Sequence, residues 1–120
     1  MASTTLVLGA SEKQDRYSNM AVRRLLAHGH PVIAVGRRAG RIAEAEIVTT
    51  LPEHASFDTV TLYLSAANQA AWREALLRLR PRRVIFNPGA ENPSFQRELE
   101  QAGCEVLEAC TLVMLSTGSY

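Results

Sequence analysis

Short apolar runs alternate along the chain with longer segments in which apolar residues recur at helical spacing. The first run, Leu6–Leu8, contains no polar position, which is typical of a central parallel strand that is buried on both faces. Gly9 and two small residues follow it, where the backbone must bend. From about Tyr17 the apolar residues fall on one helical stripe that ends near Gly29. The pattern predicts a strand, a tight turn and a helix, which form the front half of a βαβ unit.

The same alternation continues to the end of the chain. It predicts further strands over residues 31–36, 47–48, 59–64, 84–86 and 105–108. It predicts helices from about residue 69 to 79 and over 94–102, and a short helix over 51–55 with Pro52 in its first turn. Residues 42–45 are too few for a crossover helix, so a loop is expected before the third strand. We therefore expect one α/β domain over residues 1–120, a Rossmann-like, doubly wound parallel sheet in a three-layer αβα arrangement.

Composition narrows the class of protein. The chain has 120 residues and a formal net charge of +1, which argues against a broad nucleic-acid-binding surface. Cys104 and Cys110 are too few for a disulfide framework and have no metal-binding spacing. The N-terminal residues lack the features of a signal peptide, and no apolar run approaches the roughly 18 residues that span a bilayer. We expect a cytoplasmic protein with reduced thiols and no membrane partner.

In a doubly wound sheet, ligands bind at the carboxyl ends of the strands. Four turns lie there in the predicted fold: residues 9–16, 36–41, 65–68 and 87–93. The first turn has a single glycine and is a poor match to the dinucleotide pattern G-x-G-x-x-G. It nevertheless holds hydroxyls and cations that suit a pyrophosphate: Ser11, Lys13, Arg16 and Ser18. The alternative is an ordinary tight βα turn without a ligand.

The residues at the end of the second predicted strand indicate which kind of nucleotide the site would bind. An NAD site of this fold needs Asp or Glu there to hold the ribose 2′-OH. Here the residues are Gly36, Arg37 and Arg38, with no carboxylate. Arginine pairs with an additional ribose phosphate, as in NADP or coenzyme A. The alternative is that both arginines are solvated loop residues.

Two further positions are candidates for chemistry. Glu91 lies in a proline-rich turn and is either a general acid or base or, as the more frequent case, a residue that caps the next helix or orients the loop. Cys110 follows the last strand and either faces the cleft or is a structural thiol. The sequence has no Ser-His-Asp arrangement, P-loop or metal-ligand cluster. We therefore predict no catalytic residue and no metal ligand.

Four segments together resemble the stand-alone CoA-binding domain family, which is similar to the CoA-binding domain of the succinyl-CoA synthetase alpha subunit. They are Val7–Ser11 with Tyr17-Ser18, His30–Val35, Asn87–Asn92 and Glu108–Thr111, in the family's order over essentially the whole chain. The turn Asn87–Asn92 is the most specific of them. The chain departs from the family at Gly36-Arg37-Arg38, where relatives commonly have Asn-Pro, and it lacks the synthetase's phosphohistidine and grasp domains.

The resemblance implies a set of ligand contacts. The CoA pyrophosphate would lie against Gly9, Ala10 and Ser11, and the 3′-phosphate or adenosine side would meet Arg37 or Arg38. Another strand end would contribute Ser65 and Ala66. The pantetheine arm would lie near the residues of the fourth turn, with Cys110 close by: Asn87, Pro88, Gly89, Ala90 and Glu91.

These observations leave three hypotheses. The leading one is a small protein that binds coenzyme A or an acyl-CoA and has no catalytic activity of its own. The second is an NADP-binding oxidoreductase or redox-sensing module, because the two arginines suit that ligand as well. The third is a homo-oligomer or a partner subunit of a larger acyl-CoA enzyme, with the apolar segment Leu112–Leu115 in the interface.

Overall fold

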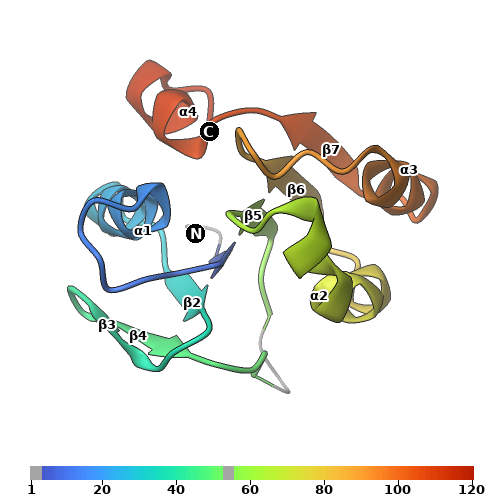
Figure 1. Ribbon diagram of the computed structural model, residues 1–120. Helices are drawn as coiled ribbons and strands as arrows, with labels where there is room; N and C mark the ends of the chain where they lie inside the picture. Colours follow the sequence, from blue (N-terminus) through green and yellow to red (C-terminus); the bar gives the residue numbers. More distant parts are fainter. Residues whose placement is uncertain (1–3, 53–55) are drawn as a thin grey trace.

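The computed structural model describes residues 4–52 and 56–120, which form a seven-stranded sheet with helices on both faces (Figure 1). In sheet order the strands are β3 (Gly40–Ile42), β4 (Ala45–Val48), β2 (Val32–Val35), β1 (Thr5–Leu8), β5 (Thr59–Leu62), β6 (Arg83–Phe86) and β7 (Glu105–Glu108). The helices of these residues are α1 (Tyr17–Ala27), α2 (Ala66–Leu79), α3 (Pro93–Gln101) and α4 (Thr111–Thr117). None of them is long and apolar enough to cross a membrane.

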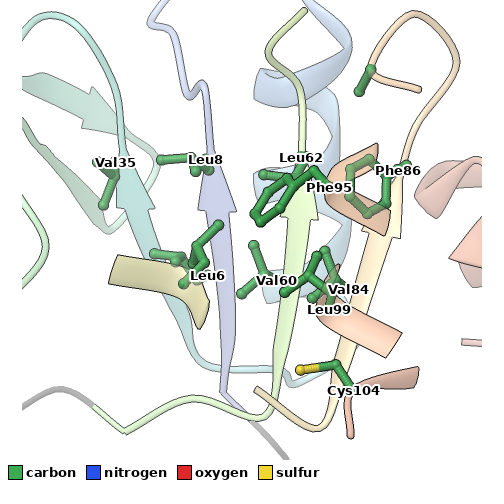
Figure 2. Packing of buried hydrophobic residues seen from close by; sticks show 12 residues of the cluster. Leu6, Leu8, Val35, Val60, Leu62, Val84, Phe86, Phe95, Leu99 and Cys104 are labelled. Carbon is green, nitrogen blue, oxygen red and sulfur yellow. The ribbon is translucent and has the colours of Figure 1, made fainter. Parts of the chain in front are cut away.

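Alternating side chains of the central strands supply two cores, one on each face of the sheet. Leu6 and Leu8 point to the face that α2 and α3 cover, whereas Val7 points to the face of α1 and α4. Figure 2 shows the first core, in which Phe95 and Leu99 of α3 pack over the strands. The three-layer, doubly wound α/β fold expected from the sequence is confirmed.

The strands that follow β1 in the chain lie on its two sides. Strands β2, β3 and β4 lie on one side of β1, and strands β5, β6 and β7 lie on the other. The pair β1–β5 is parallel and joins the two halves. The crevice above the carboxyl ends of these two strands is the switch point where ligands bind in such sheets. The fold therefore places the turns after β1, β2, β5 and β6 around one crevice.

The edge of the sheet differs from the wholly parallel prediction. The turn predicted over residues 36–41 ends in strand β3, which pairs antiparallel with β4. Only two residues separate these strands, and Ala43 takes a positive φ of 52° in the turn. Because neither residue is Gly, Asn or Asp, the sequence carried no hairpin signal. The parallel topology was wrong at this edge, and a hairpin replaces the predicted loop.

The remaining differences are local. The tail after β7, expected only to be apolar, folds into α4, which contacts α1. Helix α2 begins at Ala66 rather than at about residue 69. The short helix predicted over 51–55 lies in part outside the described residues, and the described Leu51 and Pro52 belong to no helix.

Candidate functional site

A groove of about 670 Å³ opens above the carboxyl ends of β1, β2, β5 and β6. Its lining comes from the four turns at the switch point: Gly9, Ala10, Ser11, Glu12, Lys13, Arg16, Tyr17, Ser18, Arg37, Arg38, Tyr63, Leu64, Ser65, Pro88, Gly89 and Ala90. The structure thus brings together twelve of the seventeen predicted contact residues. Glu12, Tyr17, Tyr63 and Leu64 also line the groove, and the sequence reasoning had not selected them.

The turn after β1 is held tightly against its neighbours. Gly9 has a φ of 100°, and a Cβ there would lie 3.1 Å from the carbonyl group of Tyr63. The backbone N–H groups of Gly9 and Ala10 both donate to the carbonyl of Val35, at 2.8 and 2.9 Å. These two amides are therefore engaged in the sheet, so the groups that face an anion in this loop lie further along it.

The N-terminus of α1 supplies such groups. Arg16 is its N-cap residue, its side chain makes no capping hydrogen bond, and the first turn contains no acidic residue. Arg16, Tyr17 and Ser18 at this helix end line the groove. The backbone N–H groups of Tyr17 and Ser18 have no acceptor among the described residues, whereas that of Asn19 donates to the carbonyl of Arg16 at 3.1 Å. The free N–H groups carry a partial positive charge, which favours a bound anion.

Asn19 fixes the loop that leads to this helix end. Its Nδ2 donates to the carbonyl of Ser11 at 2.9 Å, and its Oδ1 accepts a hydrogen bond from Nε of Arg23 at 2.8 Å. Asn19 is buried. Sequence reasoning missed this residue because its partner lies eight positions away, across a loop of unknown path.

Positive charge is concentrated in the groove. Four cations line it, all exposed, and within residues 4–52 and 56–120 none is in an ion pair: Lys13, Arg16, Arg37 and Arg38. Among the described lining residues, Glu12 is the single carboxylate. A chain with a net charge of +1 thus gathers a local excess at one site. Such an excess in a concave site attracts a polyanionic ligand.

Gly36 allows two backbone turns to approach closely and does not line the groove. It is buried, and a Cβ at this position would lie 2.2 Å from the carbonyl oxygen of Ala10. Its N–H donates to the carbonyl of Val48 at 2.9 Å. The turns after β1 and β2 approach each other so closely that only glycine fits. The predicted contact at Gly36 is not among the lining residues, whereas the two arginines after it are.

A hydrogen-bonded framework supports the opposite wall. Nε2 of Gln69 donates to the carbonyls of Leu64 at 2.9 Å and Ala90 at 2.6 Å. Oε1 of Gln69 accepts a hydrogen bond from Nδ2 of Asn92 at 2.9 Å. Gln69 is buried, and its bond to Ala90 is fully shielded from water. The turns after β5 and β6 are therefore locked to each other behind the groove.

Asn87 is part of a second buried network. Its Nδ2 donates to Oγ1 of Thr61 at 2.6 Å and to the carbonyl of Leu62 at 2.8 Å. Its Oδ1 accepts the backbone N–H of Thr111, at the start of α4, at 2.9 Å. Asn87 lies outside the lining and joins β5, β6 and α4 beneath it. Its place in the family-like turn is explained by this structural role.

Glu91 orients its own loop. Its Oε1 accepts the backbone N–H of Gly89 at 2.9 Å, and its side chain is outside the groove. The cap of α3 is Asn92, whose side chain accepts from the N–H of Phe95 at 3.4 Å. Of the two structural roles considered for Glu91, the geometry favours loop orientation over helix capping.

Tyr63 lines the groove, and two further predicted contacts, Cys110 and Ala66, lie outside its lining. Burial raises the pKa of Tyr63 to about 12, so its hydroxyl stays protonated at neutral pH. Cys110 is half-buried at the N-cap of α4, and Ala66 is exposed in the first turn of α2. In the described part of the chain no cluster of His, Cys, Asp or Glu is suited to a metal ion.

The fold and the groove define a Rossmann-like domain with a cationic cleft at its switch point. The sequence pattern of the CoA binding domain family matches residues 3–116. The chain belongs to this family. Among proteins with curated descriptions, none matches the chain.

Solved structures are similar over most or all of the chain. The crystal structure of an uncharacterized protein is 42% identical, covers 100% of this chain and 99% of its own, and has a TM-score of 0.95. A Thermus thermophilus protein is 24% identical with coverages of 99% and 91% and a TM-score of 0.86. The dinucleotide-forming acetyl-coenzyme A synthetase 1 of Ca. Korarchaeum cryptofilum, in complex with phosphate and ADP, is 15% identical, with a TM-score of 0.73. That match covers 89% of this chain and 25% of the synthetase.

Proposed function

We propose that the protein binds coenzyme A or an acyl-CoA in the groove, as a binding module without catalytic activity of its own. One observation carries the proposal: four cations without ion-pair partners among the described residues line the same groove as a helix N-terminus that has no side-chain cap, in a chain of the CoA binding domain family. Coenzyme A carries a pyrophosphate and a separate 3′-phosphate. A ligand with that much negative charge matches this concentration of cations.

The cations form two groups, one suited to the pyrophosphate and one suited to the 3′-phosphate of coenzyme A. Lys13 and Arg16 flank the N-terminus of α1, which suits the pyrophosphate. Arg37 and Arg38 lie at the end of β2, which suits the 3′-phosphate, because guanidinium groups bind phosphate in a bidentate manner. The pantetheine arm would then run toward the wall formed by Gly89 and its neighbours.

Calorimetry with CoA, dephospho-CoA and NADPH tests the proposal. We expect CoA to bind, and dephospho-CoA to bind about 10- to 150-fold more weakly, since charge-assisted hydrogen bonds contribute roughly 1.5–3 kcal/mol. Replacing Arg37 and Arg38 with alanine together should abolish this preference. Arg97→Ala is the matched control, because Arg97 is an exposed arginine of α3 outside the groove.

Each outcome of the titration bears on one statement. Absence of CoA binding overturns the proposed function. Equal affinity for CoA and dephospho-CoA removes the assignment of the 3′-phosphate to the two arginines. Tighter binding of NADPH than of CoA would favour the alternative of an NADP-binding module. CoA affinity should also fall steeply with salt concentration, because phosphate neutralisation dominates the interaction.

A further inference from the structure

The structure places a carboxylate beside the start of β3, at the far end of the turn that follows β2, where the sequence did not show one. Glu12 belongs to the loop after β1, but its Oε2 accepts the backbone N–H of Arg41 at 2.9 Å. Its side chain also lies against Gly40, where a Cβ would stand 2.3 Å from the Glu12 Cδ. The acid therefore reaches across from the neighbouring loop to the β3 side of the groove.

The Glu12 carboxylate is placed for a ligand. It lines the groove together with Arg37 and Arg38. The Arg41 guanidinium donates to the carbonyl of Glu44 at 3.4 Å and forms no ion pair with Glu12. In the described part of the chain, the Glu12 oxygen that does not meet the Arg41 N–H has no hydrogen-bond partner. One acceptor atom of this anchored, groove-lining carboxylate thus stays free within the described residues.

A carboxylate in a groove built for phosphates repels that ligand unless it serves another of the ligand's groups. An ionised carboxylate only accepts hydrogen bonds, so its complement is a donor such as a hydroxyl. In dinucleotide-binding sheets, an acid at the end of the second strand holds the ribose hydroxyls. Glu12 reaches this region by a different route, from the first loop instead of from the strand end itself.

We propose that Glu12 accepts a hydrogen bond from the ribose 2′-hydroxyl of the bound nucleotide, beside the phosphate held by Arg37 and Arg38, and so selects ribonucleotides over 2′-deoxyribonucleotides. The inference rests on the proposed function. Gly40 and the N–H of Arg41 are the positioning elements, because a residue larger than glycine at 40 would push the carboxylate away.

The test compares two ligands that differ in one hydroxyl: adenosine 3′,5′-bisphosphate and its 2′-deoxy analogue. Calorimetry on the full chain should give the ribonucleotide about a tenfold tighter binding, as a hydrogen bond to a charged group provides. Glu12→Ala should bring the two affinities together. Glu12→Gln should leave a preference of about threefold or less, since a neutral amide is a weaker acceptor.

Two further variants separate recognition from folding. Gly40→Ala keeps the Glu12 side chain but displaces it, so it should lower the ribose preference in the same direction as Glu12→Ala. Glu44→Gln is the control, because Glu44 is an exposed acid of the β3–β4 turn that does not line the groove, and it should keep the tenfold preference. A merely structural role of Glu12 would change both affinities equally and leave their ratio unchanged.

The outcomes distinguish the two proposals. Equal affinity of the wild-type chain for both bisphosphates overturns the role of Glu12 and leaves CoA binding untouched. If CoA binds but neither bisphosphate does so measurably, the comparison is made with CoA and 2′-deoxy-CoA, and equal affinities for these two ligands overturn the role of Glu12. If neither CoA nor a bisphosphate binds, the proposed function fails and the inference fails with it.

Discussion

Gly36→Ala tests the close approach of the two turns that frame the groove. The added Cβ would lie 2.2 Å from the carbonyl oxygen of Ala10, whereas side-chain carbons keep at least 3.0 Å from such atoms. The turns must therefore separate by about 0.8 Å. Ala10 has little freedom to move, because its N–H donates to the carbonyl of Val35 at 2.9 Å.

The expected loss of stability is about 2–3 kcal/mol, at the upper end of the cost of overpacking a well-packed interior. For a domain of this size the melting temperature should fall by roughly 8–12 °C. Urea unfolding followed by circular dichroism gives the free energy. Below its melting temperature, the Gly36→Ala variant should also bind CoA several-fold more weakly, because the displaced Ala10 lines the groove.

Gly89→Ala is the matched control. Gly89 lines the same groove with a φ of 94°, and a Cβ there would meet no atom within 4 Å. This variant carries only the conformational cost of the left-handed region, about 1 kcal/mol. If Gly36→Ala loses no more stability than Gly89→Ala, the two turns tolerate separation, and the steric reasoning is refuted.

Three other predictions concern the framework. Asn87→Ala should lower the free energy of unfolding by about 2–4 kcal/mol, because it leaves a buried backbone N–H and a buried carbonyl unpaired; a loss under 1 kcal/mol in urea would contradict this. In thiol labelling, Cys110 should react well before Cys104, whose thiol is buried with a raised pKa; the reverse order in Cys→Ser variants would contradict the burial. The bidentate Arg82 guanidinium lowers the pKa of Asp58. The stability from this pair is therefore full above the usual value of 3.8 and is lost as the pH falls below it. Because Arg82 is exposed, the stabilisation by this pair should be about 0.5 kcal/mol. An Asp58→Asn variant with the same free energy of unfolding as the wild type at both pH 7 and pH 3 would disprove it.

The main elements were predictable because their causes are local. Consecutive apolar residues such as Leu6–Leu8 need burial on both faces, and parallel strands with helical crossovers provide it. Parallel strands also end at one edge of a sheet, so the four turns were expected around one crevice. Twelve of the selected residues line it for that reason.

The misses share a different cause. The β3–β4 hairpin turns at Ala43, whose positive φ of 52° has no residue signal, so only its pairing in the sheet stabilises it. Helix α4 has too few residues to be stable alone and forms because it packs on α1. Asn87, predicted as a ligand contact, does not line the groove, and both N–H groups of its amide donate to acceptors inside the protein.

The sequence by itself determined the doubly wound fold, the edge of the sheet where a ligand would bind, and the cationic character of that edge. Periodicity and charge are properties of the chain, and neither depends on which distant segments meet. Tertiary structure decided which polar atoms are free. It packs Gly36 against the carbonyl of Ala10, and it brings the Glu12 carboxylate within hydrogen-bond distance of the N–H of Arg41, 29 residues away in sequence. A hydrogen bond between two loops depends on the path of both loops, which no local pattern encodes.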